Sequence, residues 1–594
     1  MFSASSAQTS LLEPAYQLTP AKSARLAKTW AWQFRARCLP LIDERAFAGC
    51  YCADNGRPNA PIRVVIGLLV LKEVFTLTDA EVRDAAEFDL RWQTALGLTP
   101  DAPVPCQKTV HNFRALLAVH DRAATLFADI TDQLLAALGL QTDRQRLDST
   151  QICSNIAVLS RLSRFCETHR LLLHRLARKA PGALARIPVA VQRRYVREDG
   201  TDSSDEDARS TEGRRRIAVC ARDAWRLVDA LRGVELPPTV AHAYALVERL
   251  LREQCVTLAD PATPPADDAD ATEPAVPVRG REKGEVAAGG LQTPHDPDAT
   301  YGHKGVGYTV TLGETVGNGE MPELITYVAL TNAQASDQLQ TLPAVDALAV
   351  RDMQPVELLA DTSFGSTANL LACQERGTRL IAPVPGGAVL PTDPPCIFVA
   401  CLPGAAPTAC RLGIPADTTD RITREDKTVV YLVRFAAGAC AGCPHGDVCP
   451  TVRQPDGSRQ YRVAEGEAVN LLRRWQETTP AFQDAYAWRS GIEATNSECK
   501  RAHSLGRLRV RGWAPVQVAV YLKALACNVK RAMTHWQRQA RGQETAAGAA
   551  ESVWGRWWGR IRRIGEIFRG CAHTRPPQVT ALPTLTRPTA VLAA

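Results

Sequence analysis

The chain has 594 residues, more than one hydrophobic core supports, so several domains or one domain with large insertions are expected. Its hydrophobic content of 45% is typical of globular proteins, and a formal net charge of +7 permits a polyanionic partner without requiring one. The longest apolar run, Val64–Leu71, is too short to span a bilayer, and the first residues lack a signal-peptide pattern. We therefore expect no membrane association and a cytoplasmic protein whose 18 cysteines are reduced.

The first part of the chain carries helical patterns. Residues 1–40 are expected to form a weakly ordered N-terminal tail, in which Leu26–Phe34 can form a short helix, and residues 41–140 an all-helical domain. Thr78 and Glu81 have the spacing of a capping box, which predicts the start of a helix that runs to Gly97. Helical domains of this kind bind DNA or serve dimerisation and packing, and the pattern favours neither.

The pattern then changes, and we expect a mixed α/β core to begin. Residues 141–180, its first part, contain a predicted strand at Arg146–Ile152 with Asp148 inside it. Residues 181–294 are interpreted as a helical and disordered insertion. Their Arg- and Leu-rich helical part is followed by a part rich in Pro, Ala, Asp and Gly without an apolar period.

Two more core segments are predicted, with a second insertion between them. Residues 295–385 predict a hairpin around Gly317–Gly319 and a strand that ends at Asp361 before a glycine turn. Residues 386–470 are rich in Pro, Gly and Thr with short strands, and are expected to form a β-rich insertion that bears cysteines. Residues 471–545 return to helix as the third core segment.

A helical stretch in this third segment carries a charged face. If it is one helix, Tyr486, Arg489, Glu493 and Lys500 lie on one side of it. The simplest interpretation is a solvated face with paired charges, but a carboxylate among cations can also hold a metal ion beside phosphate oxygens. Basic residues continue after it, and residues 546–594 are expected to be a basic, Trp-rich segment with a disordered tail.

Three acids stand in contexts that indicate a metal site. Asp148 lies inside an apolar strand, Asp361 closes another strand, and Glu493 lies on the basic helix. A buried carboxylate is costly unless it binds a cation or hydrogen-bond donors, although an acid before a glycine turn is often only a turn former. Two carboxylates from neighbouring strands and one from a helix can hold two Mg²⁺ or Mn²⁺ ions about 4 Å apart.

Other acids compete for this role. The rival carboxylates are Asp296, Asp298, Glu314 and Asp337. Asp296 and Asp298 are in a Pro-containing turn, which favours a solvated loop. Lys304 precedes a glycine and is a weak candidate for a phosphate contact.

Taken together, the chain resembles the DDE transposases of bacterial insertion sequences. The family signature Tyr-(2)-Arg-(3)-Glu-(6)-Lys is matched by Tyr486, Arg489, Glu493 and Lys500. RLDSTQICSNIA resembles the strand of the first Asp, and ADTSFGS resembles the segment of the second Asp. The helical stretch that begins PNAPIRVVIG resembles the N-terminal domain common in these proteins.

The resemblance implies a fold and a site. The implied fold is α/β, a ribonuclease H-like catalytic core with a mixed sheet, interrupted by insertions and preceded by the helical domain. Asp148, Asp361 and Glu493 would be the catalytic residues and the ligands of two Mg²⁺ (or Mn²⁺) ions. The residues expected to contact DNA are Tyr486, Arg489, Lys500, Arg507, Arg509 and Arg511.

The implied activity is enzymatic DNA transposition. The protein would cut the element ends by metal-dependent phosphodiester hydrolysis and join the freed 3′-hydroxyl to target DNA. Its partners would be the terminal inverted repeats and the target DNA, bound by a homodimer at the nucleoid. Two alternatives stay open: an inactive, transposase-derived DNA-binding protein, and a metal-dependent endonuclease without strand transfer.

The second insertion carries a further candidate metal site. Cys440, Cys443 and Cys449 have a spacing compatible with a structural zinc ion, and Cys410 or Cys401 would complete four ligands. The alternative is a reduced cysteine cluster without metal.

Overall fold

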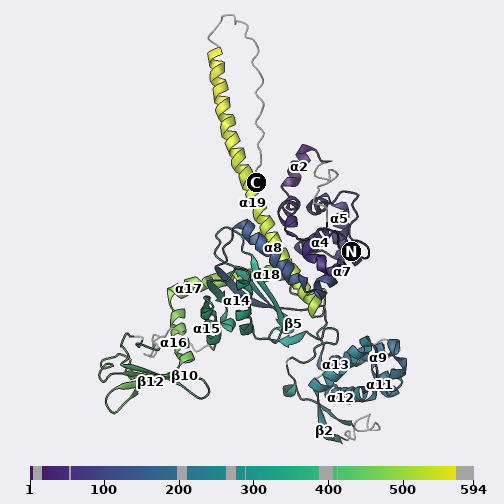
Figure 1. Cartoon of the computed structure of the whole chain (residues 1–594), viewed down its shortest axis with the longest axis vertical. Helices are drawn as coiled ribbons and strands as arrows, with labels where there is room; N and C mark the ends of the chain where they lie inside the picture. The colour runs from purple at the N-terminus through teal and green to yellow at the C-terminus, as the bar shows by residue number, and fades with distance from the viewer. Residues whose placement is uncertain are drawn as a thin grey trace. The chain divides into compact units, whose positions relative to one another are not determined.

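The structure is a computed structural model of the whole chain. It describes residues 1–4, 17–52, 55–196, 211–262, 276–287, 289–386, 406–410, 412–447 and 449–569. The chain divides into two compact units, Met1–His535 and Trp536–Ala594, whose elements are labelled in Figure 1. Within the described ranges, none of the helices has the length and apolarity that a membrane span requires.

A mixed six-stranded sheet lies in the first unit, which confirms the mixed α/β class. Its strands are β1 (Arg144–Ile152), β4 (Thr300–Gly302), β5 (Gly305–Thr315), β6 (Ile325–Asn332), β7 (Glu357–Ala360) and β8 (Arg379–Ile381). The strand order is β4-β5-β1-β7-β8, and β6 also pairs with β5. β1 runs antiparallel to β5 and parallel to β7, so it is an interior strand. The antiparallel β5–β6 pair confirms the predicted hairpin.

Helices pack against this sheet. The elements that follow β6 are the 3₁₀ turn η5 (Asp337–Gln340), α14 (Thr341–Ala349), the 3₁₀ turn η6 (Thr362–Phe364) and α15 (Thr367–Glu375). α14 contacts β6, α15 contacts β8, and α18 (Gly491–Ala502) contacts β1. β1 is buried on both of its faces as a result, with Leu147 and Ile152 in the core.

The N-terminal part is helical, as predicted. Its helices are α2 (Pro20–Ala27), α3 (Trp30–Gln33), the π-helical η1 (Phe34–Cys38), α4 (Ile62–Phe75), α5 (Asp79–Phe88), α6 (Leu90–Leu96), α7 (Gln107–Val119) and α8 (Arg122–Leu138), with 3₁₀ turns η2 (Leu39–Leu41) and η3 (Arg45–Cys50). The capping box of Thr78 and Glu81 is present at the start of α5.

Two details of this region differ from the sequence-based expectation. Within the expected tail, where a short helix was predicted only at Leu26–Phe34, the chain is helical from Pro20 onward, because Leu26, Phe34 and Leu39 are buried in the core. The single helix expected up to Gly97 is two helices, since the Asp89 carboxylate accepts the Arg91 amide and caps a new one.

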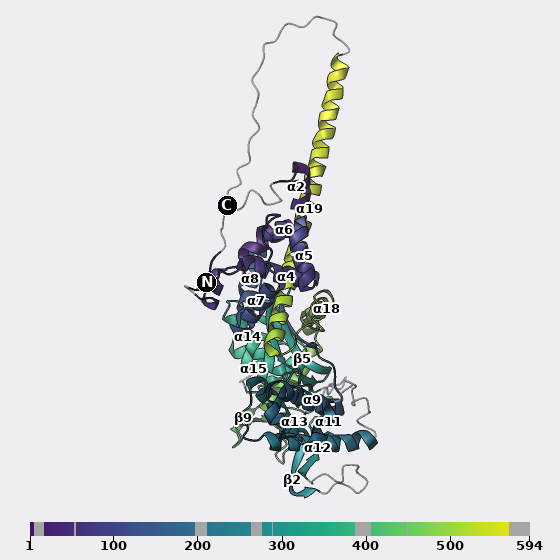
Figure 2. The ribbon, with the colours of Figure 1, turned by 90° about the vertical axis from the view of Figure 1, so that its right-hand side faces the viewer.

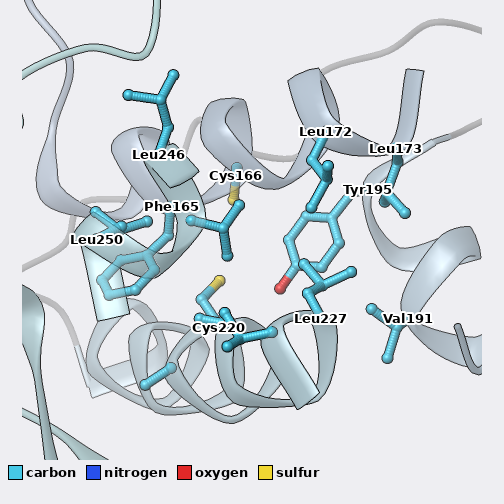
Figure 3. Packing of buried hydrophobic residues seen from close by; sticks show 14 of the residues in the cluster. Phe165, Cys166, Leu172, Leu173, Val191, Tyr195, Cys220, Leu227, Leu246 and Leu250 are labelled. Atoms are coloured by element: carbon cyan, nitrogen blue, oxygen red, sulfur yellow. The ribbon is translucent and has the colours of Figure 1, made fainter. Parts of the chain in front are cut away.

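The first insertion forms a helical bundle with its own hydrophobic core. It consists of α9 (Arg161–Lys179), α10 (Pro181–Leu184), α11 (Val189–Tyr195), α12 (Thr211–Leu231), α13 (Pro238–Gln254), β2 (Cys255–Ala262), β3 (Val276–Gly280) and the 3₁₀ turn η4 (Lys283–Glu285). Figures 1 and 2 both show α9, α11, α12 and α13 gathered together. Figure 3 shows part of the core, in which Tyr195 lies beside Leu227 and Phe165 lies beside Leu250.

The limits of this insertion need correction. α9 was expected largely inside the core segment 141–180, but its apolar stripe, including Leu162, Phe165 and Leu172, packs against α12 and α13. Part of the stretch expected to be disordered forms the antiparallel pair β2–β3, in which Val276 and Val278 are buried. Residues 263–275 between these strands lie outside the described residues.

The second insertion is β-rich, as its short strands indicated. β9 (Thr418–Thr423), β10 (Val429–Phe435), β11 (Val452–Arg453) and β12 (Arg459–Ala464) pair antiparallel in the order β11-β12-β10-β9. Its core contains Tyr431, Val433 and Phe435 from β10 and Val463 from β12. Helix α16 (Glu465–Glu477) follows directly and packs against β10 and β12.

The C-terminal part is helical. α17 (Pro480–Ala487), the 3₁₀ turn η7 (Trp488–Ser490) and α18 precede the long helix α19 (Trp513–Arg569). The predicted basic, Trp-rich segment is helical up to Arg569. The predicted disordered tail after it lies outside the described residues.

Candidate active site

The register of the sheet brings Asp148 and Asp361 together. β1 and β7 are parallel neighbours, with Leu147 opposite Ala360, so the next residues of the two strands are Asp148 and Asp361. Both carboxylates line a cavity of about 480 Å³. Asp148 is mostly buried, with 11% of its side chain exposed, whereas 32% of the Asp361 side chain is exposed.

The Asp361 side chain is held by the turn that follows it. Its Oδ1 accepts the Ser363 amide at 2.8 Å and the Ser363 hydroxyl at 2.5 Å, which caps the 3₁₀ turn η6. Asp361 therefore does form a turn, which was the simpler of the two interpretations of its position before a glycine. Its Oδ2 nevertheless faces Arg489 at 3.9 Å.

The charged stretch is not one helix. Tyr486 lies in α17, Arg489 in η7, and both Glu493 and Lys500 in α18. The backbone stays helical through the 3₁₀ turn, so Arg489 still contacts Glu493 across an i,i+4 spacing. Arg489, Glu493 and Lys500 line the same cavity as the aspartates, whereas Tyr486 does not.

Arg489 contacts all three carboxylates. Its Nη1 donates to Glu493 Oε1 at 2.7 Å, and its Nη2 donates to Asp148 Oδ1 at 3.1 Å. Nη2 also lies 3.9 Å from Asp361 Oδ2. The guanidinium thus marks the point where β1, the end of β7 and α18 converge.

Other residues of the cavity were missed or undervalued from sequence. Asn496 donates through Nδ2 to Asp148 Oδ2 at 2.9 Å, and its Oδ1 is buried without a hydrogen-bond partner among the described residues. It stands three positions after Glu493, a helical spacing that could have identified it. The cavity is also lined by Lys304 and Asp337. From sequence, Lys304 was only a weak candidate for a phosphate contact and Asp337 only a rival carboxylate.

Burial alters the charges of this site. Burial raises the pKa of Asp148 above its usual value, and Asp361 raises it further, while Arg489 opposes both effects. Burial likewise raises the pKa of Asp337. Burial and the neighbouring Lys304 lower the pKa of Lys500. These shifts are typical of groups gathered at a functional site, although buried structural networks cause them too.

A buried ion network fixes α18 against the sheet. Glu314 of β5 is fully buried and accepts Arg146 Nε at 2.6 Å, Thr495 Oγ1 at 2.6 Å and Arg531 Nη1 at 3.1 Å. Arg146 also donates to the Trp488 carbonyl at 2.8 Å. The rival carboxylate Glu314 therefore connects β1, β5, α18 and α19, and it does not line the cavity.

Asp296 is not the solvated residue expected from its turn. It is fully buried and accepts hydrogen bonds from the Ser154 and Tyr308 hydroxyls, both at 2.5 Å. The Pro-containing turn folds inward because these two donors satisfy the carboxylate.

The remaining predicted DNA-binding residues lie outside the carboxylate cavity. Tyr486 is half-buried and stacks on Phe482, with ring centroids 5.6 Å apart. Arg507, Arg509 and Arg511 are exposed. The first two line a separate cavity of about 350 Å³ between α4, α7 and α19, together with the basic residues Lys72, His111, Arg114 and Lys523.

The predicted zinc ligands share one neighbourhood. Cys440, Cys443, Cys449 and Cys410 all pack against the core of the β-rich insertion. Burial raises the pKa of Cys440, and the other three cysteines raise it further, while Arg459 lowers it. No three of these thiols lie within 4.8 Å of one another. In the described residues, the only three His, Cys, Asp or Glu ligand atoms that come this close belong to Glu498, His503 and Cys527.

Two segments of the chain are similar to known protein families. Residues 410–533 match the family described as transposase DDE domain, and residues 27–116 match the family described as transposase domain (DUF772). Both are transposase families, so the matches support a transposase function.

The two matches cover different parts of the chain. The DDE match contains Glu493 and the cysteine cluster, and the other match covers most of the N-terminal helical region. Taken together they support a transposase of the insertion-sequence type. Asp148 and Asp361 lie outside both segments. A comparison with curated proteins finds no match.

Proposed function

We propose that the protein is a DDE transposase of an insertion sequence. In this proposal it cuts the element ends by metal-dependent phosphodiester hydrolysis and joins the freed 3′-hydroxyl to target DNA. The observation that carries the proposal is the convergence of Asp148, Asp361 and Glu493, from three separate elements, on one cavity and one arginine. The mixed sheet would then be a ribonuclease H-like core.

The donor set fits a hard divalent cation. Three carboxylates provide oxygen ligands, and the buried Oδ1 of Asn496, which has no hydrogen-bond partner among the described residues, provides a further oxygen. Oxygen donors of this kind suit Mg²⁺ or Mn²⁺, and DDE transposases generally use divalent metal ions. When bound, a pair of such ions supplies an activated oxygen nucleophile and stabilises the leaving oxygen. Asp148, Asp361 and Glu493 would hold them.

The cations around the cavity would bind the DNA backbone. Lys304, Lys500 and Arg501 line the cavity beside the acids, where they can contact phosphate oxygens. Arg489 can change from carboxylate partner to phosphate clamp, since its guanidinium offers donors to either anion. The exposed Arg507, Arg509 and Arg511 would extend this contact along the DNA.

The other parts of the chain have proposed roles too. We assign the sheet, α14, α15, α17, α18 and the first part of α19 to the catalytic core, and the N-terminal helices to DNA binding or dimerisation. A homodimer on DNA would bring two sites to two element ends. Cys440, Cys443, Cys449 and Cys410 would hold a structural zinc ion, which requires their thiols to come closer together.

The decisive experiment compares cleavage of a donor DNA carrying the element ends, with Mg²⁺ present. We expect Glu493→Gln to lower the cleavage rate at least ~100-fold, because a lost metal ligand removes several kcal/mol of transition-state stabilisation. The matched control is Asp484→Asn, an exposed carboxylate on α17 outside the cavity, which should cut like the wild type.

Each outcome separates the alternatives. Equal cutting by wild type and Glu493→Gln would remove Glu493 from the active site. A wild type that binds the ends without cutting would identify an inactive DNA-binding derivative. Cutting without joining to a target would identify an endonuclease.

A further inference from the structure

A second group of metal-ligating side chains lies away from the carboxylate cavity. Ligand atoms of Glu498, His503 and Cys527 all lie within 4.8 Å of one another. His503 and Cys527 are fully buried, and 30% of the Glu498 side chain is exposed. Glu498 belongs to α18, His503 follows it, and Cys527 belongs to α19. None of the three lines the carboxylate cavity.

The histidine is prepared to be a ligand. His503 Nδ1 lies 2.9 Å from the Glu73 carbonyl oxygen of α4. A carbonyl only accepts, so Nδ1 carries the proton and Nε2 holds a free lone pair. Nε2 is buried, makes no well-aligned hydrogen bond among the described residues, and faces the Cys527 thiol. A backbone carbonyl behind one ring nitrogen, with the other nitrogen free, is the usual arrangement of a metal-bound histidine.

The glutamate also has an oxygen to offer. Both contacts from Arg531, Nε at 3.0 Å and Nη2 at 2.9 Å, go to Glu498 Oε2. The second oxygen, Oε1, is left for another partner. Arg531 fixes the carboxylate in place without using all of its capacity.

The cysteine has a second thiol beside it. A hydrogen bond with Cys499 and burial raise the pKa of Cys527, while a hydrogen bond with His503 lowers it. Cys499 is fully buried and directly follows Glu498. The converging ligand atoms are therefore one nitrogen, one oxygen and one sulfur, and the Cys499 thiol does not belong to this group.

We propose that Glu498, His503 and Cys527 bind a Zn²⁺ ion, with the fourth position open to a water molecule. Nitrogen and sulfur donors favour Zn²⁺ over Mg²⁺. Bond lengths of about 2.0–2.3 Å put tetrahedral ligands roughly 3.3–3.8 Å apart, so small side-chain movements suffice. The Cys527 thiol releases its proton to solvent on binding. With Cys527 and Glu498 ionised, the ligands carry a charge of −2, which neutralises the ion.

The ion would have a structural role. It would join α18, which carries Glu493, to α19, and its histidine ligand is hydrogen-bonded to α4. A zinc ion here would hold α18, and with it Glu493, in position. The ion itself would not contact DNA.

The test is a Co²⁺ titration of the reduced, chelator-treated full-length protein. The background is Cys440→Ser/Cys443→Ser, which removes the other proposed zinc site. We expect one Co²⁺ per chain with the charge-transfer absorption of a thiolate–cobalt bond, displaced by Zn²⁺. Cys527→Ser and Glu498→Gln should each weaken binding more than about tenfold, since even outer partners of metal ligands are worth that much. Cys373→Ser, a buried thiol of α15, is the matched control.

The outcomes are separable. A background protein without the thiolate–cobalt absorption would overturn the proposal. So would unchanged affinity in a folded Cys527→Ser. If circular dichroism shows that Cys527→Ser does not fold, Glu498→Gln decides, because its amide keeps the hydrogen bonds from Arg531. Equal affinity of Glu498→Gln and the Cys373→Ser control would then reject the site. The same comparison in the wild-type sequence should show the loss of one metal equivalent.

Discussion

At the scale of single residues, Arg489 connects the whole candidate site. It is 15% exposed, whereas its partner Glu493 is 64% exposed, so the pair is not an ordinary surface ion pair. Metal ions and Arg489 would compete for the same carboxylate oxygens. Under the proposed function, Arg489 would stabilise the three close acids in the metal-free protein and would bind phosphate once metal ions occupy the carboxylates.

Asp148 gives a prediction about pH. The pKa of Asp148 is higher in the folded protein than in the unfolded chain, so folding favours the protonated side chain. This contribution to stability is complete at a pH below the pKa of the unfolded chain. It is lost as the pH rises through the pKa of the folded protein. At neutral pH the ionised side chain therefore costs stability. Without divalent ions, Asp148→Asn should melt at a temperature equal to or above that of the wild type at pH 7, while cleavage is lost.

Thermal unfolding over a pH series checks this. The difference in melting temperature between variant and wild type should grow as pH rises above about 4, the usual range of Asp. A variant that melts several degrees lower at pH 7, or a difference independent of pH, would contradict it. Asp484→Asn, which is exposed, should show neither effect.

The acidic residues of the candidate site could largely be predicted from the sequence, but the residues that contact them could not. Asp148 and Asp361 stood out because each adjoins an apolar strand, and sheet register brings such positions together. Glu314 looked equivalent in sequence. Its partners Arg146 and Arg531 are 168 and 217 positions away, so only the folded chain identifies it as an ion-network residue. Asn496 carries no charge and gave no signal beyond its spacing.

At the scale of elements, the turn before α18 decides where Glu493 lies. The sequence favoured one continuous helix because no proline interrupts residues 481–502. The structure instead has η7, in which the Trp488 carbonyl accepts Arg146 from β1. This long-range contact coincides with the change from α-helical to 3₁₀ geometry at Trp488–Ser490. A similar long-range effect moves α9 from the expected core segment into the helical bundle.

Gly491, the first residue of α18, tests this arrangement. A Cβ atom there would lie 2.0 Å from Arg146 Nη1. Arg146 cannot easily move away, because Glu314 and the Trp488 carbonyl hold it. We expect Gly491→Ala to cost about 1–3 kcal/mol of stability through overpacking. Cleavage should fall ~10- to 100-fold, since a displacement of about 1 Å disturbs catalytic geometry.

The matched control is Gly466→Ala in the first turn of α16, where a Cβ atom meets nothing within 4 Å. It should be neutral or slightly stabilising. Denaturant unfolding and donor-DNA cleavage measure both effects. If Gly491→Ala cleaves at the wild-type rate, the contact with Arg146 does not position α18.

At the scale of the first unit, distant parts of the chain are joined by buried polar contacts. Lys523 of α19 pairs with Glu73 of α4 at 2.5 Å and donates to the His503 carbonyl at 2.7 Å. Thr76 donates to the Ala502 carbonyl at 2.6 Å. Composition and periodicity predicted helices at both places but could not pair residues 450 positions apart.

The Glu73–Lys523 pair gives the last prediction. Both side chains are about nine-tenths buried, so Glu73→Gln leaves a buried ammonium without its counter-charge. We expect the free energy of unfolding to fall by about 3–5 kcal/mol. The control is Glu87→Gln, whose exposed pair with Arg83 should contribute no more than ~0.5 kcal/mol.

The pH dependence distinguishes this pair from a packing effect. Burial by itself would raise the pKa of Glu73, but Lys523 and Lys72 outweigh it and lower the pKa. The stability from this lowered pKa is present above the usual Glu value of about 4.3 and is lost as pH falls through the folded pKa. Urea unfolding at several pH values should therefore show wild type and Glu73→Gln converging in acid. A constant gap between them would show that the variant disturbs packing and not an ion pair between α4 and α19.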